Sequence, residues 1–325
     1  MKFRTEIEVD PFDTPIDYES RILAMGSCFA ASIGGELQRA KFRTEVNPTG
    51  VLFNPASIAR TLERFAECRM VGVEELTRGC EGWFHYDFHS SVGCGESAEK
   101  SVESINRAIE RGHKALREAD WVVLTLGTAW IYELKDSGEV VANCHKEPAS
   151  TFTRRRMDVA EIVETLASLM EGALSGKRVI LTLSPIRHLA DGLAQNSLSK
   201  ATLRVAIEAI AERYPQRINY FPAYEILMDD LRDYRFYGVD MVHPSATAVE
   251  YIWEQFQGVA IGEGARKIMP RVMKIVRGVE HRPLDIASEG YQKFCRSQLD
   301  AIAQLPDVDL SAESCFFTEQ LEKKS

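Results

Sequence analysis

The sequence predicts an α/β protein in which helices cover both faces of a mainly parallel sheet. Five apolar segments have the length of strands, and helical patterns lie between most of them. Two of these segments, 121–126 and 178–183, are almost uniformly apolar, which is typical of strands buried on both faces. Strands that alternate with helices favour right-handed βαβ units and therefore a parallel sheet.

Each element follows from a local pattern. Asn54 and Pro55 form a good helix start, since asparagine caps a helix and proline suits its first position. Apolar spacing places the other helices. The expected strands are 21–25, 42–46, 121–126, 178–183 and 218–221, and the expected helices between and after them are 56–68, 97–118, 157–174, 198–211 and 246–255.

Beyond residue 260 the pattern is helical without a strand, with helices expected over 265–279 and 285–303. We therefore expect one domain over residues 1–260 and a helical C-terminal extension over 261–325, packed on it or trailing from it. The polar segment 306–325 is expected to be loosely held, and residues 321–325 to fray.

The composition is that of a globular protein. The 325 residues are 45% hydrophobic and carry a net charge of −9, which disfavours binding to nucleic acid or to an anionic membrane. The local exception is the run Arg154-Arg155-Arg156, which could contact phosphate or could be a solvated helix entry. The N-terminus lacks the apolar run of a secretory signal, and no segment offers about 18 apolar residues for a membrane span. We expect a cytoplasmic protein.

The seven cysteines include no Cys-x-x-Cys pair and are thinly spread, as expected for reduced thiols. This pattern argues against a disulfide framework and against a cysteine-rich zinc site.

Ser27 lies where the first apolar strand turns into a helix. Such a turn can hold a hydroxyl within reach of a substrate, and the free N–H groups of the helix start would stabilise developing negative charge. A simple helix cap is the alternative role. Cys28 is intrinsically the better nucleophile, but its side chain points about 100° away on a helix and is expected to pack inward.

A serine nucleophile needs a base, and Asp240 and His243 supply a candidate pair. Their spacing lets the carboxylate reach Nδ1 of the imidazole and leaves Nε2 facing outward. Asp240 could instead cap the turn before the helix that begins near Ala246.

The sequence resembles the GSCFA family, which is similar to the SGNH (GDSL-like) hydrolases. The resemblance implies a flavodoxin-like three-layer sandwich with about five strands, a Ser27–His243–Asp240 site and no cofactor. The motifs that carry it span roughly residues 20 to 250 and comprise Gly26-Ser27-Cys28-Phe29-Ala30, Asn47-Pro48-Thr49-Gly50, Phe53-Asn54-Pro55, Tyr86-Asp87-Phe88-His89-Ser90, Leu126-Gly127-Thr128-Ala129-Trp130, Asn143-Cys144-His145-Lys146, Ser184-Pro185-Ile186-Arg187-His188 and Asp240-Met241-Val242-His243.

The resemblance also implies an oxyanion hole made by the backbone N–H groups of Ser27 and Gly50. SGNH enzymes supply a third donor from an asparagine in Gly-x-Asn, where this chain has Ala129. The candidates to replace that donor are Thr128, the indole of Trp130, Asn143 and His145. Packing is the alternative role for Trp130.

Other polar residues are candidates for substrate binding. His85 and His89 have zinc-like spacing, but the glutamate of His-Glu-x-x-His is absent and the aromatic surroundings favour a loop, so we expect no metal there. Interleaved aromatic and polar groups suit a sugar instead. By the resemblance, His145, Lys146, Arg187 and His188 line the mouth of the site, where Lys146 and Arg187 would favour a carboxylate or phosphate; anchoring of their loops is the alternative.

These observations predict a serine-dependent ester hydrolase that removes a small acyl group from a carbohydrate or related metabolite. An O-acyltransferase that uses the same three residues is the nearest alternative. An inactive binding module is the other, because the missing asparagine at Ala129 weakens the case for catalysis.

Overall fold

The computed structural model describes residues 4–322 and is built on a five-stranded parallel sheet. The strand order is β2-β1-β6-β10-β11, which is the flavodoxin-like order, so the predicted fold is confirmed. The strands are β1 Arg21–Gly26, β2 Arg43–Val46, β6 Trp121–Leu126, β10 Arg178–Leu183 and β11 Ile218–Phe221.

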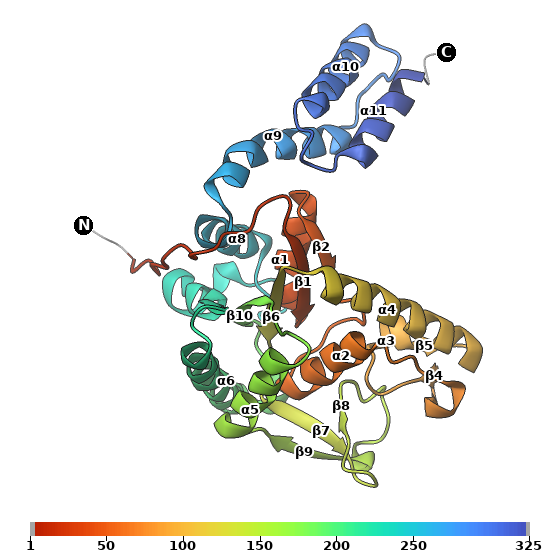
Figure 1. The fold of residues 1–325 in the computed structure, drawn as a ribbon, viewed down its shortest axis with the longest axis vertical. Coiled ribbons are helices and arrows are strands. Elements are labelled where there is room, and N and C mark those ends of the chain that lie inside the picture. The colour runs from red at the N-terminus through yellow and green to blue at the C-terminus, as the bar shows by residue number, and fades with distance from the viewer. Residues whose placement is uncertain (1–3, 323–325) are drawn as a thin grey trace.

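The two faces of the sheet pack against different helices, which produces the three layers (Figure 1). Along β1, Ile22 and Ala24 enter one core, and Leu23 and Met25 enter the other, as alternation in a strand requires. The first core is covered by α1 Cys28–Arg39 and α8 Ala246–Ala260, and the second by α2 Pro55–Glu67, α4 Ala98–Glu118, α5 Val159–Glu171 and α6 Leu193–Arg213.

Two small antiparallel sheets were not expected from the sequence. One orders its strands β3-β4-β5, and the other β8-β7-β9. The second is inserted between β6 and α5, and Figure 1 shows it beside α2 and α5. The six strands are β3 Thr77–Gly79, β4 Gly82–Phe84, β5 Cys94–Gly95, β7 Trp130–Leu134, β8 Val140–Val141 and β9 Phe152–Arg156.

Short helical segments complete the domain. They are η1 Val73–Glu75, α3 Ser90–Gly93, η2 Ala149–Thr151, η3 Leu189–Asp191, α7 Ala223–Glu225, the π-helical turn η4 Ile226–Leu231 and η5 Tyr234–Phe236.

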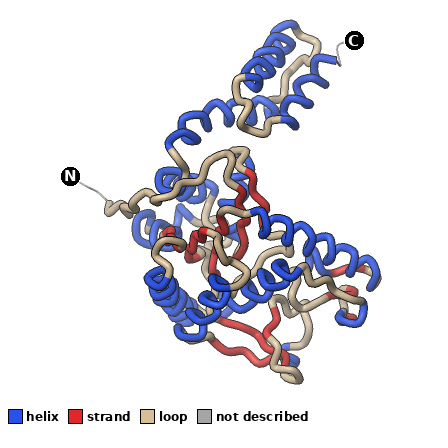
Figure 2. The backbone as a smooth tube through the Cα atoms, in the orientation of Figure 1, coloured by secondary structure: helices blue, strands red, loops and turns tan. Residues whose placement is uncertain are grey.

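The C-terminal region is helical and projects away from the sheet (Figures 1 and 2). It consists of α9 Glu263–Glu280, α10 Glu289–Ala303 and α11 Ser311–Glu322. The expectation of a loosely held tail is wrong for α11, because Phe317 is fully buried against Phe294 and Glu313 pairs with Lys41 near the sheet. The last residues of the tail, 323–325, lie outside the described part. Within the described part, no helix combines the length and the apolar character needed to cross a membrane.

Candidate active site

A pocket of about 540 Å³ lies beyond the carboxyl ends of the parallel strands. Its walls come from the segments that follow β1, β2, β6 and β10, from the β8-β7-β9 sheet and from the loop before α8. Ligands of open α/β sheets bind at this edge. The lining residues are Cys28, Phe53, Asn54, His89, Thr128, Trp130, Tyr132, Val141, Ala142, Asn143, Cys144, Arg154, Ile186, Arg187, His188, Leu189, Ala190, Val242 and His243.

Ser27 is the N-cap of α1, next to the pocket-lining Cys28. Its Oγ accepts a hydrogen bond from the Phe29 N–H at 3.3 Å and donates one to Ser184 Oγ at 3.0 Å. The side chain lies where β1 turns into the helix, but only 1% of the residue is exposed. Ser27 therefore caps α1 and also lies next to the pocket.

The turn before Ser27 depends on Gly26, which has φ +134°. A Cβ at this position would lie 2.2 Å from the Thr125 carbonyl oxygen, so only glycine fits. The Gly26 N–H donates to Asn47 Oδ1 at 2.9 Å. The Asn47-Pro48-Thr49-Gly50 block thus holds the end of β1 in place.

Asp240 and His243 form a tight pair on the rim of the pocket. Nδ1 of His243 lies 2.7 Å from Oδ2 of Asp240, and Oδ1 of Asp240 accepts the N–H groups of Val242 and His243 at 2.9 and 3.0 Å. The backbone N–H of His243, followed by that of Val242 and by the imidazole, lowers the pKa of Asp240 to about 2. The carboxylate therefore stays charged and orients the ring.

The third contact of a triad is not formed. Among residues 4–322, no hydrogen bond joins Ser27 to His243, whose side chain is about half exposed. Catalytic hydrogen bonds are often long before substrate binds. Attack by Ser27 would require its hydroxyl to turn from Ser184 toward the imidazole.

Cys28 does not only pack inward as expected. It contacts the core formed with α1, but it also lines the pocket. Burial raises the pKa of its thiol, which disfavours the nucleophilic thiolate. Cys28 is thus a second potential nucleophile beside Ser27, and its burial makes the thiol less reactive.

Two of the predicted oxyanion donors are already engaged, which corrects that part of the sequence-based site. The N–H of Ser27 donates to the Thr125 carbonyl at 3.1 Å, and the N–H of Gly50 closes a turn onto Asn47 O at 2.8 Å. Gly50 packs against His89 instead, since a Cβ there would lie 2.3 Å from that side chain.

Of the candidates for the third donor, Thr128, Trp130 and Asn143 line the pocket, and His145 does not. Thr128 Oγ1 pairs with Ser199 at 3.1 Å and accepts the Trp130 N–H, and Asn143 Oδ1 accepts the His145 N–H. The indole Nε1 of Trp130 differs, because this buried atom has no hydrogen-bond partner among the described residues. Because the atom is buried, a ligand oxygen can reach it only when the side chains that cover it move.

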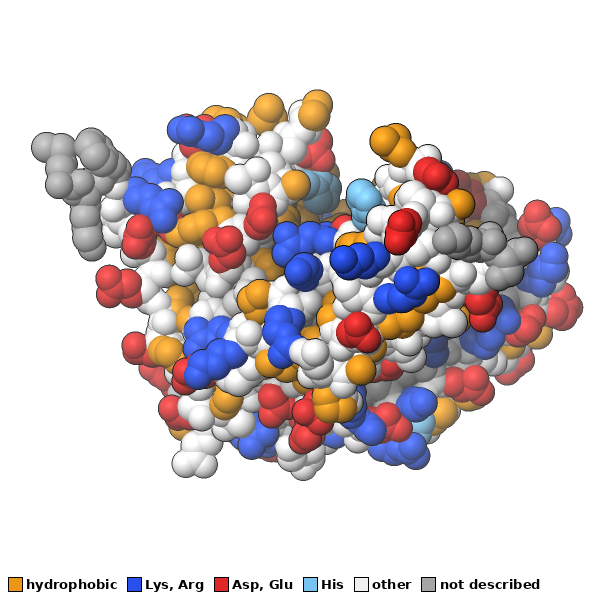
Figure 3. All heavy atoms as spheres, turned by 90° about the horizontal axis from the view of Figure 1, so that it is seen from above, with side chains coloured by type: hydrophobic (Ala, Val, Ile, Leu, Met, Phe, Trp, Pro, Cys, Tyr) orange, Lys and Arg blue, Asp and Glu red, His pale blue; other side chains and the backbone are white. Residues whose placement is uncertain are grey.

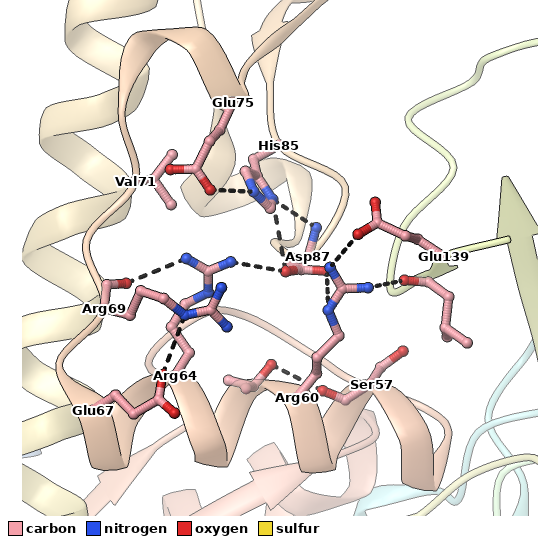
Figure 4. Close-up of polar contacts among 12 residues, drawn as sticks. Ser57, Arg60, Arg64, Glu67, Arg69, Val71, Glu75, His85, Asp87 and Glu139 are labelled. Atoms are coloured by element: carbon pink, nitrogen blue, oxygen red, sulfur yellow. Dashed lines mark hydrogen bonds and ion pairs between the residues drawn. The ribbon is translucent and has the colours of Figure 1, made fainter. Parts of the chain in front are cut away.

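His85 does not line the pocket. It is buried in a charged network that fixes the 85–89 loop to α2 (Figure 4). Its Nδ1 accepts the Asp87 N–H, and the Asp87 carboxylate pairs with Arg64 at 3.2 Å and with Arg60 at 3.4 Å. Burial lowers the pKa of His85, so a neutral ring is favoured. This corrects the expectation that His85 contacts substrate.

His145 and Lys146 also face away from the pocket. The buried His145 ring stacks on Phe84 and its Nε2 lies 3.1 Å from the His85 carbonyl, and the exposed Lys146 pairs with Glu81 at 2.5 Å. These contacts anchor the loop, which was the alternative role. Of the six predicted binding residues, His89, Arg187 and His188 line the pocket.

Two residues of this region were missed in the sequence. Ser184 follows β10 and is the partner of Ser27. Lys200 on α6 is fully buried, and its Nζ donates to the carbonyls of Gly127 and Ser184 at 2.7 and 2.6 Å. It joins the ends of β6 and β10. Ser184 begins the motif Ser184-Pro185-Ile186-Arg187-His188, but nothing in the sequence distinguishes Lys200 from a surface lysine.

The histidines with zinc-like spacing do not form a metal site. His85 lies in a loop and His89 is the N-cap of α3, so the pair does not occupy one helix face. Within residues 4–322, no group of three or more His, Cys, Asp or Glu side chains could hold an ion.

The fold and the site define a flavodoxin-like α/β protein with a serine at the end of its first strand and an Asp–His pair on the rim of the pocket beside it. The chain belongs to the GSCFA family, whose model matches residues 21–256. A second model, for the C-terminal domain of GSCFA domain proteins, matches residues 272–323.

The chain resembles individual known proteins only distantly. None of the curated proteins matches the chain. Among solved structures it is similar to an acetyl xylan esterase from the rumen bacterium Butyrivibrio proteoclasticus, with a TM-score of 0.34 and 11% identity. That alignment covers 75% of this chain and 64% of the esterase, so the chain spans less than two thirds of that protein.

Proposed function

We propose that the protein is a serine-dependent ester hydrolase that removes a small acyl group from a carbohydrate or related metabolite. The observation that carries the proposal is the Asp240–His243 pair, held at 2.7 Å on the rim of a pocket that Ser27 adjoins. A charged carboxylate fixed by two backbone N–H groups has the role of orienting a base.

In the proposed reaction, Ser27 Oγ attacks the ester carbonyl while Nε2 of His243 takes its proton. His243 then returns the proton to the leaving alcohol and activates a water that releases the acid. Asp240 stabilises the imidazolium formed in both steps. The unpartnered indole N–H of Trp130 is the donor that we assign to the forming oxyanion.

The aromatic wall supports a carbohydrate as the alcohol part. Phe53, Trp130 and Tyr132 line the pocket, where Arg154 stacks on Trp130 and Tyr132, and His89 and Asn143 offer polar atoms beside them. This mixture suits a sugar, which has apolar faces and polar edges.

A non-catalytic binding module is the second candidate. The bond from Ser27 to Ser184, in place of one to His243, favours it, as does the engagement of the Ser27 and Gly50 N–H groups.

Labelling of the full-length protein with a fluorophosphonate, together with hydrolysis of 4-nitrophenyl acetate, tests the proposal. We expect labelling of the wild type and its loss in Ser27→Ala and His243→Ala. Cys28→Ala is the matched control on the neighbouring residue and should still be labelled. Loss of labelling in Cys28→Ala alone would transfer the nucleophile to Cys28, and an unlabelled, inert wild type would favour the binding module.

A further inference from the structure

The pocket differs in charge from the chain as a whole. The chain has 48 acidic residues and a net charge of −9, yet no aspartate or glutamate is among the described side chains that line the pocket, which leave out that of Asp191. Acidic and basic side chains are interspersed on the face seen from the side of the C-terminal helices (Figure 3). The pocket instead presents Arg154, Arg187 and three histidines.

Of the two arginines, Arg187 is the one that contacts the segment of the Asp240–His243 pair. Its guanidinium stacks on the ring of Tyr237 at 4.3 Å and on that of Tyr234 at 5.4 Å. Among the side chains that the structure describes, which leave out that of Asp191, no carboxylate forms an ion pair with it. Both tyrosines also form side-chain hydrogen bonds with the guanidinium. A guanidinium has five N–H donors, so some of them are left for an anion.

Arg187 is also tied to the proposed base. Its backbone N–H donates to the Val242 carbonyl at 3.4 Å, and Val242 immediately precedes His243. Both side chains line the same pocket. An anion on Arg187 and an ester at His243 therefore fit one small molecule.

We propose that the substrate carries a carboxylate or phosphate group that pairs with the guanidinium of Arg187. This inference rests on the proposed ester hydrolysis and names the class of its substrate: an anionic acyl ester whose uncharged part lies against the aromatic wall. Arginine matches the two oxygens of either anion with two parallel N–H donors.

Three esters test the inference. 4-Nitrophenyl acetate is neutral. The ester 3-carboxy-4-nitrophenyl acetate carries the anion on the leaving group, and 4-nitrophenyl hemisuccinate carries it on the acyl group. We expect Arg187→Gln to lower the ratio of kcat/KM for one of the anionic esters to that for the neutral ester by about 10-fold or more. Arg187→Lys should lose less, because the charge remains.

Arg235→Gln is the matched control. Arg235 lies in η5 between the two tyrosines that hold Arg187, but it is exposed, pairs with Asp233 and does not line the pocket. An equal fall of the ratio in both variants, or no fall in Arg187→Gln, would overturn the inference.

Titration with succinate and with inorganic phosphate separates this inference from the proposed function and distinguishes the two anions. If the wild type hydrolyses no ester but binds either anion, and Arg187→Gln weakens binding about 10-fold, the anion site stands and the hydrolase does not. If neither anion binds and the ester ratios are unchanged, the anion site is overturned.

Discussion

Ser27 Oγ donates its hydrogen bond to Ser184 Oγ at 3.0 Å, so in this structure the hydroxyl is directed toward the residue that follows β10 and is not bonded to His243. A neutral hydrogen bond of this kind is worth about 1 kcal/mol. The Ser27 hydroxyl must give up that bond before His243 can accept its proton. Ser184 is therefore expected to hold the hydroxyl in a resting position.

Removal of the Ser184 hydroxyl is expected to make Ser27 more reactive. Ser184→Ala should raise the rate of fluorophosphonate labelling by up to about 5-fold, because the competing bond of about 1 kcal/mol is lost. Thr182→Val is the control, since Thr182 lies on the same strand and its buried hydroxyl has no partner among the described residues. A fall of about 10-fold in Ser184→Ala would instead mean that Ser184 positions Ser27 for attack.

Trp130→Phe is expected to lower kcat by about 10²-fold with little change in KM, because the indole N–H is assigned to the oxyanion and the ring remains for packing. Tyr132→Phe, at the next residue of β7 that lines the pocket, should have a small effect. Steady-state kinetics on one ester measures both. An unchanged kcat in Trp130→Phe would leave packing as the role of this residue.

Lys200 should make the stability of the protein depend on pH. Burial lowers its pKa to about 7, below the value of about 10.4 expected in the unfolded chain. The unfolded state then binds more protons between these values, so the free energy of unfolding should rise with pH from about 7 to 10. Below pH 7 the cost of the buried charge is fully present.

Urea unfolding at pH 7, 8 and 9 measures this effect. Lys200→Met should remove the rise in the free energy of unfolding. Lys274→Met, at an exposed lysine, should leave it unchanged. If the free energy of unfolding changes with pH in the same way in the wild type and in Lys200→Met, the carbonyls of Gly127 and Ser184 keep the ammonium charged.

Gly26→Ala is expected to lower the free energy of unfolding by about 2–4 kcal/mol, because its φ of +134° and the Thr125 carbonyl leave no room for a Cβ. Gly35→Ala is the matched control in α1. A Cβ there meets nothing within 4 Å, so a gain of about 0.5–1 kcal/mol is expected from helix propensity. Thermal unfolding compares the two, and equal stabilities would contradict the role assigned to Gly26.

The main sheet was predictable because its central strands, β1, β6 and β10, are apolar on both faces. The strands at 121–126, 178–183 and 218–221 have the predicted bounds. The small sheets were missed for the opposite reason: β3 and β5 are short and rich in glycine, and β9 contains three arginines. The alternation in Trp130–Leu134 and the turn at Gly138 were the available signals for β7.

Only those features of the site that depend on residues close together in the sequence were predictable. The spacing of Asp240 and His243 anticipates their contact, because it depends on one turn of chain. His85 and His145 could not be separated from His89, since the direction of a side chain depends on distant partners such as Arg64 and Phe84. Lys200 could not be recognised, because its burial follows from how α6 packs on the sheet.

The β8-β7-β9 sheet supplies Trp130, Tyr132 and Arg154 to the pocket but pairs with no strand of the main sheet. Sequence changes in this insertion could therefore alter which molecule is accepted while Ser27, Asp240 and His243 keep their surroundings. Different members of the family could in this way share the proposed reaction and differ in substrate. An exchange of residues 131–156 between two of them, which leaves Trp130 in place, would then transfer selectivity and keep the catalytic residues unchanged.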